Sequence, residues 1–88
     1  MAERTVTVAS KVGLHARPAA VFVKKASELS VPVTLAKDGS EPVSAKSMLQ
    51  VMSLDVRHGD RVVVAAEGDG AADAVEELAR LLETDLDA

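Results

Sequence analysis

Three segments of the chain have the apolar patterns of β-strands. Residues 5–8 alternate polar and apolar side chains, and residues 31–35 form a mostly apolar run. The run 61–66 is the most apolar of the three, so we expect it in the centre of a sheet. An Asp-Gly pair at 38–39 predicts a hairpin turn, which leads into a short return strand at 41–43.

Three further segments space their apolar residues as helices do. The first runs from about residue 16 to residue 29, the second is a short apolar helix over 48–54, and the third covers about 71–82. The predicted order is therefore β-α-β-β-α-β-α. Short strands with a hairpin and few helices favour an α+β fold, in which helices cover one face of an antiparallel or mixed sheet. The length suits a single domain over residues 1–88, without a linker or an internal repeat.

Composition narrows the possible functions. The chain has no cysteine, which excludes disulfides and thiolate metal sites, and its two histidines are too far apart for a zinc motif, so no metal or cofactor is expected. Phe22 is its one aromatic residue, which argues against a nucleic-acid partner because single-stranded bases stack on aromatic side chains. No apolar run approaches the ~20 residues that span a membrane, and the first residues lack a signal-peptide core. We therefore expect a cytoplasmic protein that does not insert into a membrane.

The charges are unevenly distributed along the chain. Residues 1–46 contain seven Lys or Arg against four acidic residues, a net charge of +3, whereas residues 47–88 contain three Arg against ten acidic residues, a net charge of −7. Four cations lie close to His15 in sequence: Lys11, Arg17, Lys24 and Lys25. The pattern fits either an ordinary solvated helix face or a positive surface that attracts an acidic partner.

The segment 13–19, with the sequence GLHARPA, carries the strongest chemical signal. Proline is tolerated in the first turn of a helix, so Pro18 places the helix start near Ala16 and places His15 at or just before it. Free backbone N–H groups and the helix dipole favour an anion there. Histidine is a poor N-cap, but a phosphorylated histidine would offer oxygens to those N–H groups. The pattern predicts a histidine that becomes phosphorylated, with Arg17 either solvated or stabilising the phosphate charge during transfer.

The same segment resembles the active-site signature of the HPr family, the phosphocarriers of the bacterial phosphoenolpyruvate:sugar phosphotransferase system. The resemblance extends over essentially the whole chain. Residues 46–49 (KSML) and 51–54 (VMSL) are similar to the regulatory-serine segment of the Gram-positive members, and residues 66–68 (AEG) resemble the end of the family's last strand. Two independent motifs at the expected separation make this a specific match.

The resemblance implies an open-faced β-sandwich, in which four antiparallel strands carry three helices on one face. It implies that His15 accepts a phosphoryl group on Nδ1 from phosphorylated enzyme I and passes it to a histidine on the IIA component of a sugar permease. Arg17 would assist the transfer. The protein would then be a stoichiometric carrier in sugar transport rather than an enzyme.

Ser47 has a structural and a regulatory interpretation. A serine that opens a helix, with Gln50 three residues later, fits a capping box. The resemblance implies a regulatory phosphorylation site, whose added charge would repel the acidic surfaces of the transfer partners. An HPr kinase/phosphorylase would then be a further partner. Both interpretations can hold for one exposed serine.

Met48, Leu49 and Met52 lie on a short helix that cannot bury every apolar side chain. Some of them belong to the core, whereas the resemblance implies a docking surface for enzyme I and the IIA component. In that arrangement the patch surrounds His15 together with three residues of the first helix, which are Ala16, Ala20 and Lys24. An accessible His15 favours a monomer.

Two positions depart from the family pattern. Val12 stands where many members have a polar residue, and Asp55 occupies a position often held by glycine at the end of the short helix. Two other functions remain open. One is a regulatory HPr-like protein that binds a transcription factor in its seryl-phosphorylated form, although the known purely regulatory relatives lack the histidine. The other is a carrier in a dedicated nitrogen-related or dihydroxyacetone-kinase relay. His58 lies in a turn and is interpreted as a solvated residue.

Overall fold

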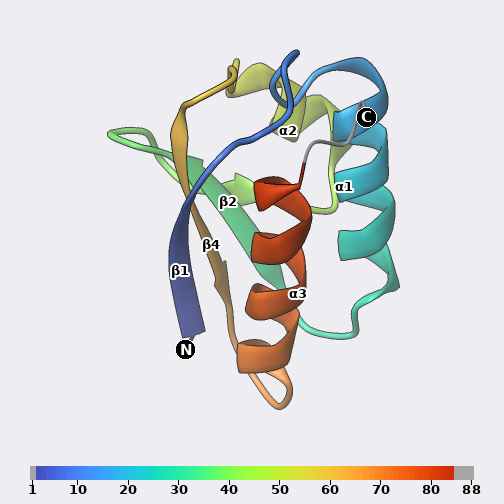
Figure 1. Ribbon diagram of the computed structural model, residues 1–88. Helices are drawn as coiled ribbons and strands as arrows, with labels where there is room; N and C mark the ends of the chain where they lie inside the picture. The colour runs from blue at the N-terminus through green and yellow to red at the C-terminus, as the bar shows by residue number, and fades with distance from the viewer. Residues whose placement is uncertain (1, 85–88) are drawn as a thin grey trace.

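The computed structural model describes residues 2–84, and its elements follow the order predicted from the sequence. Four strands form one antiparallel sheet, and three helices lie on one of its faces (Figure 1). The elements are β1 (Ala2–Thr7), α1 (Ala16–Glu28), β2 (Val33–Lys37), β3 (Val43–Ser44), α2 (Met48–Ser53), β4 (Arg61–Ala66) and α3 (Ala71–Glu83). This is the open-faced α+β sandwich that the family resemblance implies.

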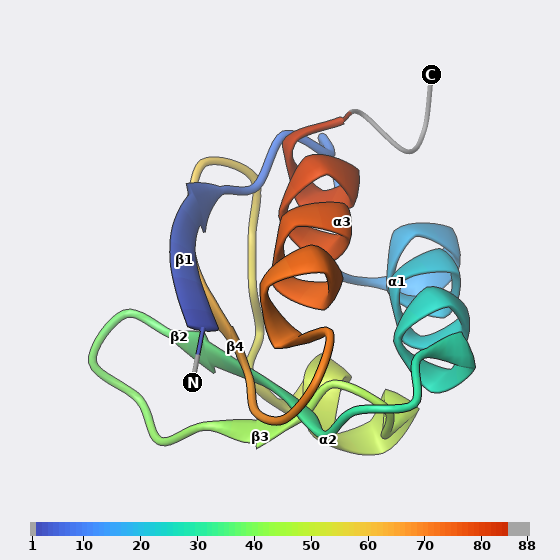
Figure 2. The ribbon, with the colours of Figure 1, turned by 90° about the horizontal axis from the view of Figure 1, so that it is seen from below.

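The strand order of the sheet is β1-β4-β2-β3, so β4 lies between two antiparallel neighbours. This confirms the prediction of a central strand at residues 61–66. Val64 lies opposite Arg4 of β1 on one side and opposite Leu35 of β2 on the other. Figure 2 shows the strands on one side of the molecule and the two long helices, α1 and α3, on the other.

The core lies between the sheet and the helices. Every second residue of β4 is buried, namely Val62, Val64 and Ala66, because successive side chains of a strand point to opposite faces. From the helices, Leu78 of α3 and Phe22 of α1 are fully buried against this face. Burying a side chain of this size stabilises the fold by roughly 1.5–3 kcal/mol, so the apolar stripes of α1 and α3 hold both helices on the sheet.

β2 begins two residues later than the pattern predicts, at residue 33 instead of 31. Pro32 has no N–H to donate to a neighbouring strand, although its carbonyl accepts the N–H of Glu67 at 3.4 Å. Pairing with β4 therefore starts at Val33, opposite Ala66. The ends of the other predicted elements differ from the observed ones by three residues or fewer.

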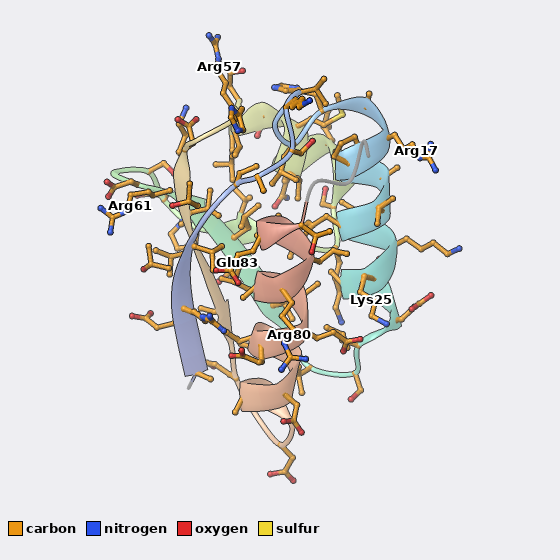
Figure 3. All side chains as sticks on the ribbon, in the orientation of Figure 1. Arg17, Lys25, Arg57, Arg61, Arg80 and Glu83 are labelled. Atoms are coloured by element: carbon orange, nitrogen blue, oxygen red, sulfur yellow. The ribbon has the colours of Figure 1, made fainter. Side chains whose placement is uncertain are left out.

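Ion pairs tie α3 to the elements beside it. The Nζ atom of Lys25 in α1 lies 2.7 Å from Oε1 of Glu77, and Arg4 of β1 pairs with Glu76. Part of the acidic excess of the C-terminal half is therefore neutralised on α3. Lys25 points into this α1–α3 contact, as Figure 3 shows, and does not belong to a positive surface around His15.

Two loops meet above the end of the sheet: the β1–α1 loop (residues 8–15) and the α2–β4 loop (residues 54–60). Gly13 has φ +69°, and a Cβ atom at this position would lie 2.2 Å from the carbonyl oxygen of Val56 and 2.6 Å from Cα of Arg57. The N–H of Leu14 donates to the same Val56 carbonyl at 3.0 Å. Backbone atoms cannot move away as a side chain can, so only glycine fits here.

Asp60 fixes the second of these loops. Its Oδ2 atom accepts the backbone N–H of Arg57 at 2.9 Å and lies 3.3 Å from Nζ of Lys37. The hydrogen bond from Arg57, together with the nearby ammonium group of Lys37, holds the pKa of Asp60 below its ordinary value. The ionised carboxylate therefore favours the folded state.

We predict that Gly13→Ala lowers the free energy of unfolding by about 2–4 kcal/mol, because it adds overpacking to an unfavourable positive φ. Urea unfolding would measure this loss. Gly39→Ala is the matched control, since Gly39 has φ +86° but nothing within 4 Å of an added Cβ. The free energy of unfolding of the control should fall by only about 1 kcal/mol, because alanine adopts a positive φ less readily than glycine. Equal losses in the two variants would contradict the close contact at Gly13.

Asp60→Asn should be less stable than the wild type at neutral pH, and the difference should shrink as the pH falls. The native pKa of Asp60 is lowered, so its stabilising effect is complete above the unfolded pKa of about 4 and is lost as the pH falls through the lower native value. Urea midpoints measured from pH 7 down to pH 2.5 test this. A difference that stays constant over that range would show that the charge of Asp60 does not stabilise the loop.

Candidate functional site

His15 is the N-cap residue of α1, as the sequence predicts. Its backbone is extended (φ −129°, ψ 159°), and its side chain makes no capping hydrogen bond. The side chain is 37% exposed, so an incoming group can reach it. The N–H groups of Ala16 and Arg17 lie in the first helical turn, where the helix supplies no acceptor for them. The imidazole therefore stands beside two donors that can bind an anion.

Ala16 has φ +50°, in the left-handed region that residues other than glycine rarely adopt. This conformation costs roughly 1–2 kcal/mol for an alanine. It turns the chain sharply between the extended His15 and the helix that follows. Nothing in the sequence indicates it, because alanine carries no preference for this region.

A carboxylate lies beside the imidazole. Oδ1 of Asp55, in the α2–β4 loop, is 3.4 Å from Nε2 of His15. Its other oxygen, Oδ2, accepts a hydrogen bond from Nη2 of Arg57 at 3.0 Å. This hydrogen bond and the charge of Arg57 lower the pKa of Asp55, so the carboxylate is ionised at neutral pH. Asp55 therefore connects His15 to Arg57.

His15 opens into a hollow of about 440 Å³ between the two loops. Its lining residues are Lys11, Val12, His15, Asp55, Arg57 and His58. Lys11 and Arg57 face the same space as His15 together with the carboxylate of Asp55, so the charges that line the hollow leave a positive excess that favours a negatively charged group there. No sequence pattern indicates that Arg57 and His58 are neighbours of His15. Contacts between the two loops bring them together, including the close approach at Gly13 and the hydrogen bonds of Val8 with Gly59 and Asp60, and no local motif indicates these contacts.

Arg17 does not line this hollow. Its side chain is exposed, and Figure 3 shows it pointing outward from the first turn of α1, whereas Arg57 projects from the top of the molecule in that view. Within residues 2–84 the Arg17 side chain has no ion pair and no hydrogen bond. Its role in stabilising phosphate therefore stays a prediction.

Ser47 is the N-cap of α2, and its Oγ atom accepts the N–H of Gln50 at 3.3 Å. The predicted cap is therefore present. The side chain of Gln50 differs from a complete capping box, because its Oε1 atom accepts the N–H of Ser44 at 2.9 Å instead of that of Ser47. Gln50 thereby ties α2 to β3.

The residues proposed for docking lie on α1 and α2, which pack against each other. Leu49 is 81% exposed and Met52 is 40% exposed, whereas Met48 is half-buried. Val12 in the β1–α1 loop is a further large apolar side chain, 51% exposed. The residues from α1 are all exposed, and they are Ala16, Ala20 and Lys24.

The structure limits two other classes of site within residues 2–84. The Cys, His, Asp and Glu side chains of this part of the chain form no group of three or more that could hold a metal ion. Across the same residues, none of the helices has the length and apolar character needed to cross a bilayer.

Comparison with known proteins places this chain in a family. The family model "PTS HPr component phosphorylation site" matches residues 2–84. The phosphocarrier protein HPr of Streptomyces coelicolor is 49% identical over 82 residues, which cover 93% of this chain and 88% of that protein.

Solved structures agree with this match. The crystal structure of HPr-C-His from Thermoanaerobacter tengcongensis superposes with a TM-score of 0.92 at 42% identity and covers 100% of this chain and 98% of that one. Crh of Bacillus subtilis, described as a catabolite repression protein and solved as a domain-swapped dimer, gives a TM-score of 0.74 at 40% identity, with 97% of each chain covered. This chain therefore belongs to the HPr family, the phosphocarriers of the phosphotransferase system.

Proposed function

We propose that this protein carries a phosphoryl group on Nδ1 of His15, accepting it from phosphorylated enzyme I and passing it to a histidine of a IIA component of a sugar permease. The position of His15 is the observation that supports this proposal most strongly. A half-exposed imidazole stands at the N-terminus of α1, without a capping bond of its own, beside a hollow that Lys11 and Arg57 line.

The chemistry of this position suits reversible transfer. Nδ1 is the ring nitrogen nearer the backbone, so a phosphoryl group on it would lie toward the free N–H groups of Ala16 and Arg17. These donors stabilise the phosphate charge without enclosing it, and the open hollow leaves it accessible to a second protein. A stoichiometric carrier, with no cofactor, is the role that we infer.

Arg17 contributes to transfer in this proposal. No ion pair or hydrogen bond within residues 2–84 holds its side chain, so it can turn toward the phosphoryl group without breaking an interaction. A guanidinium offers planar paired donors that match phosphate oxygens.

The docking surface proposed around His15 consists of Ala16, Ala20, Lys24, Met48, Leu49 and Met52. The exposure of Leu49 and Met52 supports it, because adaptable apolar side chains suit a carrier that binds several partners. Lys24 adds positive charge toward acidic partners. We infer a cytoplasmic monomer, since both partners need access to His15.

His15→Ala should accept no phosphate, because the nucleophile is lost. Incubation with enzyme I and labelled phosphoenolpyruvate measures this, and the label on the wild type should be lost in acid and survive alkali. His58→Ala should still take up label. Unfolding curves would show that His15→Ala keeps the fold, since the side chain makes no capping bond. Label on His15→Ala would overturn the assignment of the acceptor.

Ser47 is proposed as a regulatory site for an HPr kinase/phosphorylase. Ser47→Asp should slow acceptance from enzyme I several-fold at low salt, because negative charge at the docking surface repels an acidic partner. The effect should weaken at high salt. Aspartate is a good N-cap, so α2 is preserved. Ser27→Asp, an exposed position in α1, is the control with the same change of charge. Equal rates in both variants would remove the regulatory role.

A regulatory role like that of Crh is the second candidate, because the likeness to Crh covers nearly the whole chain. The presence of His15 favours the carrier. Absence of label on the wild type, with an active enzyme I control, would favour the regulatory protein or a carrier in a dedicated relay.

A further inference from the structure

Asp55 lies at the phosphorylation site without a role in the function proposed above. Its carboxylate is 3.4 Å from Nε2 of His15, on the ring edge opposite the nitrogen that accepts the phosphoryl group. It also occupies a backbone conformation with φ +52°, which glycine adopts with less strain. Glycine would relieve this backbone strain but would leave no carboxylate beside the imidazole.

The backbone around Asp55 is fixed, so its carboxylate is held in place. Nζ of Lys37 donates to the carbonyl of Asp55 at 3.0 Å. The next residue, Val56, accepts the N–H of Leu14, directly beside His15 in the sequence. The first bond anchors the loop that carries the carboxylate to β2, and the second ties that loop to the one that carries the imidazole.

We propose that Asp55 is a positioning residue for phosphoryl transfer: its carboxylate holds the proton of His15 on Nε2, which leaves Nδ1 as the free nucleophile and keeps the ring turned toward the N-terminus of α1. This inference rests on the proposed function. The 3.4 Å separation is longer than an ordinary hydrogen bond, and such contacts commonly shorten when the reacting complex forms.

The transfer step shows what the carboxylate does. The lone pair of Nδ1 forms the new N–P bond while the bond between phosphorus and the donor breaks, and the electrons of that bond go to the donor. The proton stays on Nε2, so positive charge develops on the ring of His15 as the phosphoryl group arrives. An anion beside Nε2 stabilises this charge more in the transition state than in the free protein.

A carboxylate near His15 would repel the incoming phosphoryl group, and Arg57 reduces this repulsion. The guanidinium binds Oδ2 of Asp55 while Oδ1 faces His15, so much of the charge of the carboxylate is offset. The same guanidinium lines the hollow and attracts the incoming anion. Asp55 and Arg57 therefore act on the ring and on the phosphoryl group as a nearly neutral pair.

The test uses Asp55→Gly, which removes the carboxylate and suits the positive φ, so it should fold at least as well as the wild type. Two measurements are made on each protein. Imidazole ¹⁵N chemical shifts at alkaline pH report which nitrogen of His15 carries the proton. Rates with phosphorylated enzyme I report acceptance. Asp69→Asn, an exposed site in the turn before α3, controls for loss of one negative charge. Arg57→Gln separates the loss of the carboxylate from the release of Arg57.

Asp55→Gly should show less complete protonation of Nε2 and an acceptance rate lower by about two- to five-fold, as expected for an exposed charge pair. Asp69→Asn should match the wild type in both measurements, and Arg57→Gln should keep the proton on Nε2. Unchanged chemical shifts in Asp55→Gly would overturn the inference, whether or not the rate falls. Absence of label on the wild type would overturn the proposed function, and the chemical shifts would still decide the role of Asp55.

Discussion

The close approach of Gly13 to the backbone of Val56 and Arg57 is the contact on which the site depends. It joins two loops that are about forty residues apart in the sequence. Hydrogen bonds from the N–H of Leu14 to the carbonyl of Val56, and between Val8 and the residues Gly59 and Asp60, support this contact. With it, the hollow gains Asp55, Arg57 and His58 on one side and Lys11 on the other. The absence of a side chain at Gly13 thus allows the two loops to approach closely enough to place these charges beside the imidazole.

The sheet and the two long helices hold in place the elements that these two loops connect. The buried face of β4 holds α1 and α3 on the sheet, and Arg4 and Lys25 form ion pairs with α3. The cations that face His15 come from loops and not from the long helix faces. The uneven charge along the sequence is therefore a poor guide to the charge at the site, since Lys25 is paired elsewhere and Arg57 comes from the acidic half of the chain.

Sequence patterns predicted the elements well because those patterns are local. The apolar run at 61–66 identified the central strand, Pro18 located the helix start beside His15, and Ser47 identified the cap of α2. The surroundings of His15 could not be predicted in the same way. Asp55 was recognisable only as a departure from the family pattern, since its contact with His15 depends on tertiary structure. The positive φ of Ala16 has no sequence signal, because alanine occurs there against its own preference.

In our proposal the side chain of Asp55 affects the reactivity of His15, whereas the stability of the fold does not depend on it. The residue is exposed and lies in a loop whose bonds to neighbouring segments come from backbone groups and from Lys37, so the sheet and its buried face do not depend on its side chain. An exchange at this one position can therefore change how readily the imidazole reacts while the core stays as it is. An exchange at this position would then tune the rate at which the carrier accepts a phosphoryl group independently of its stability.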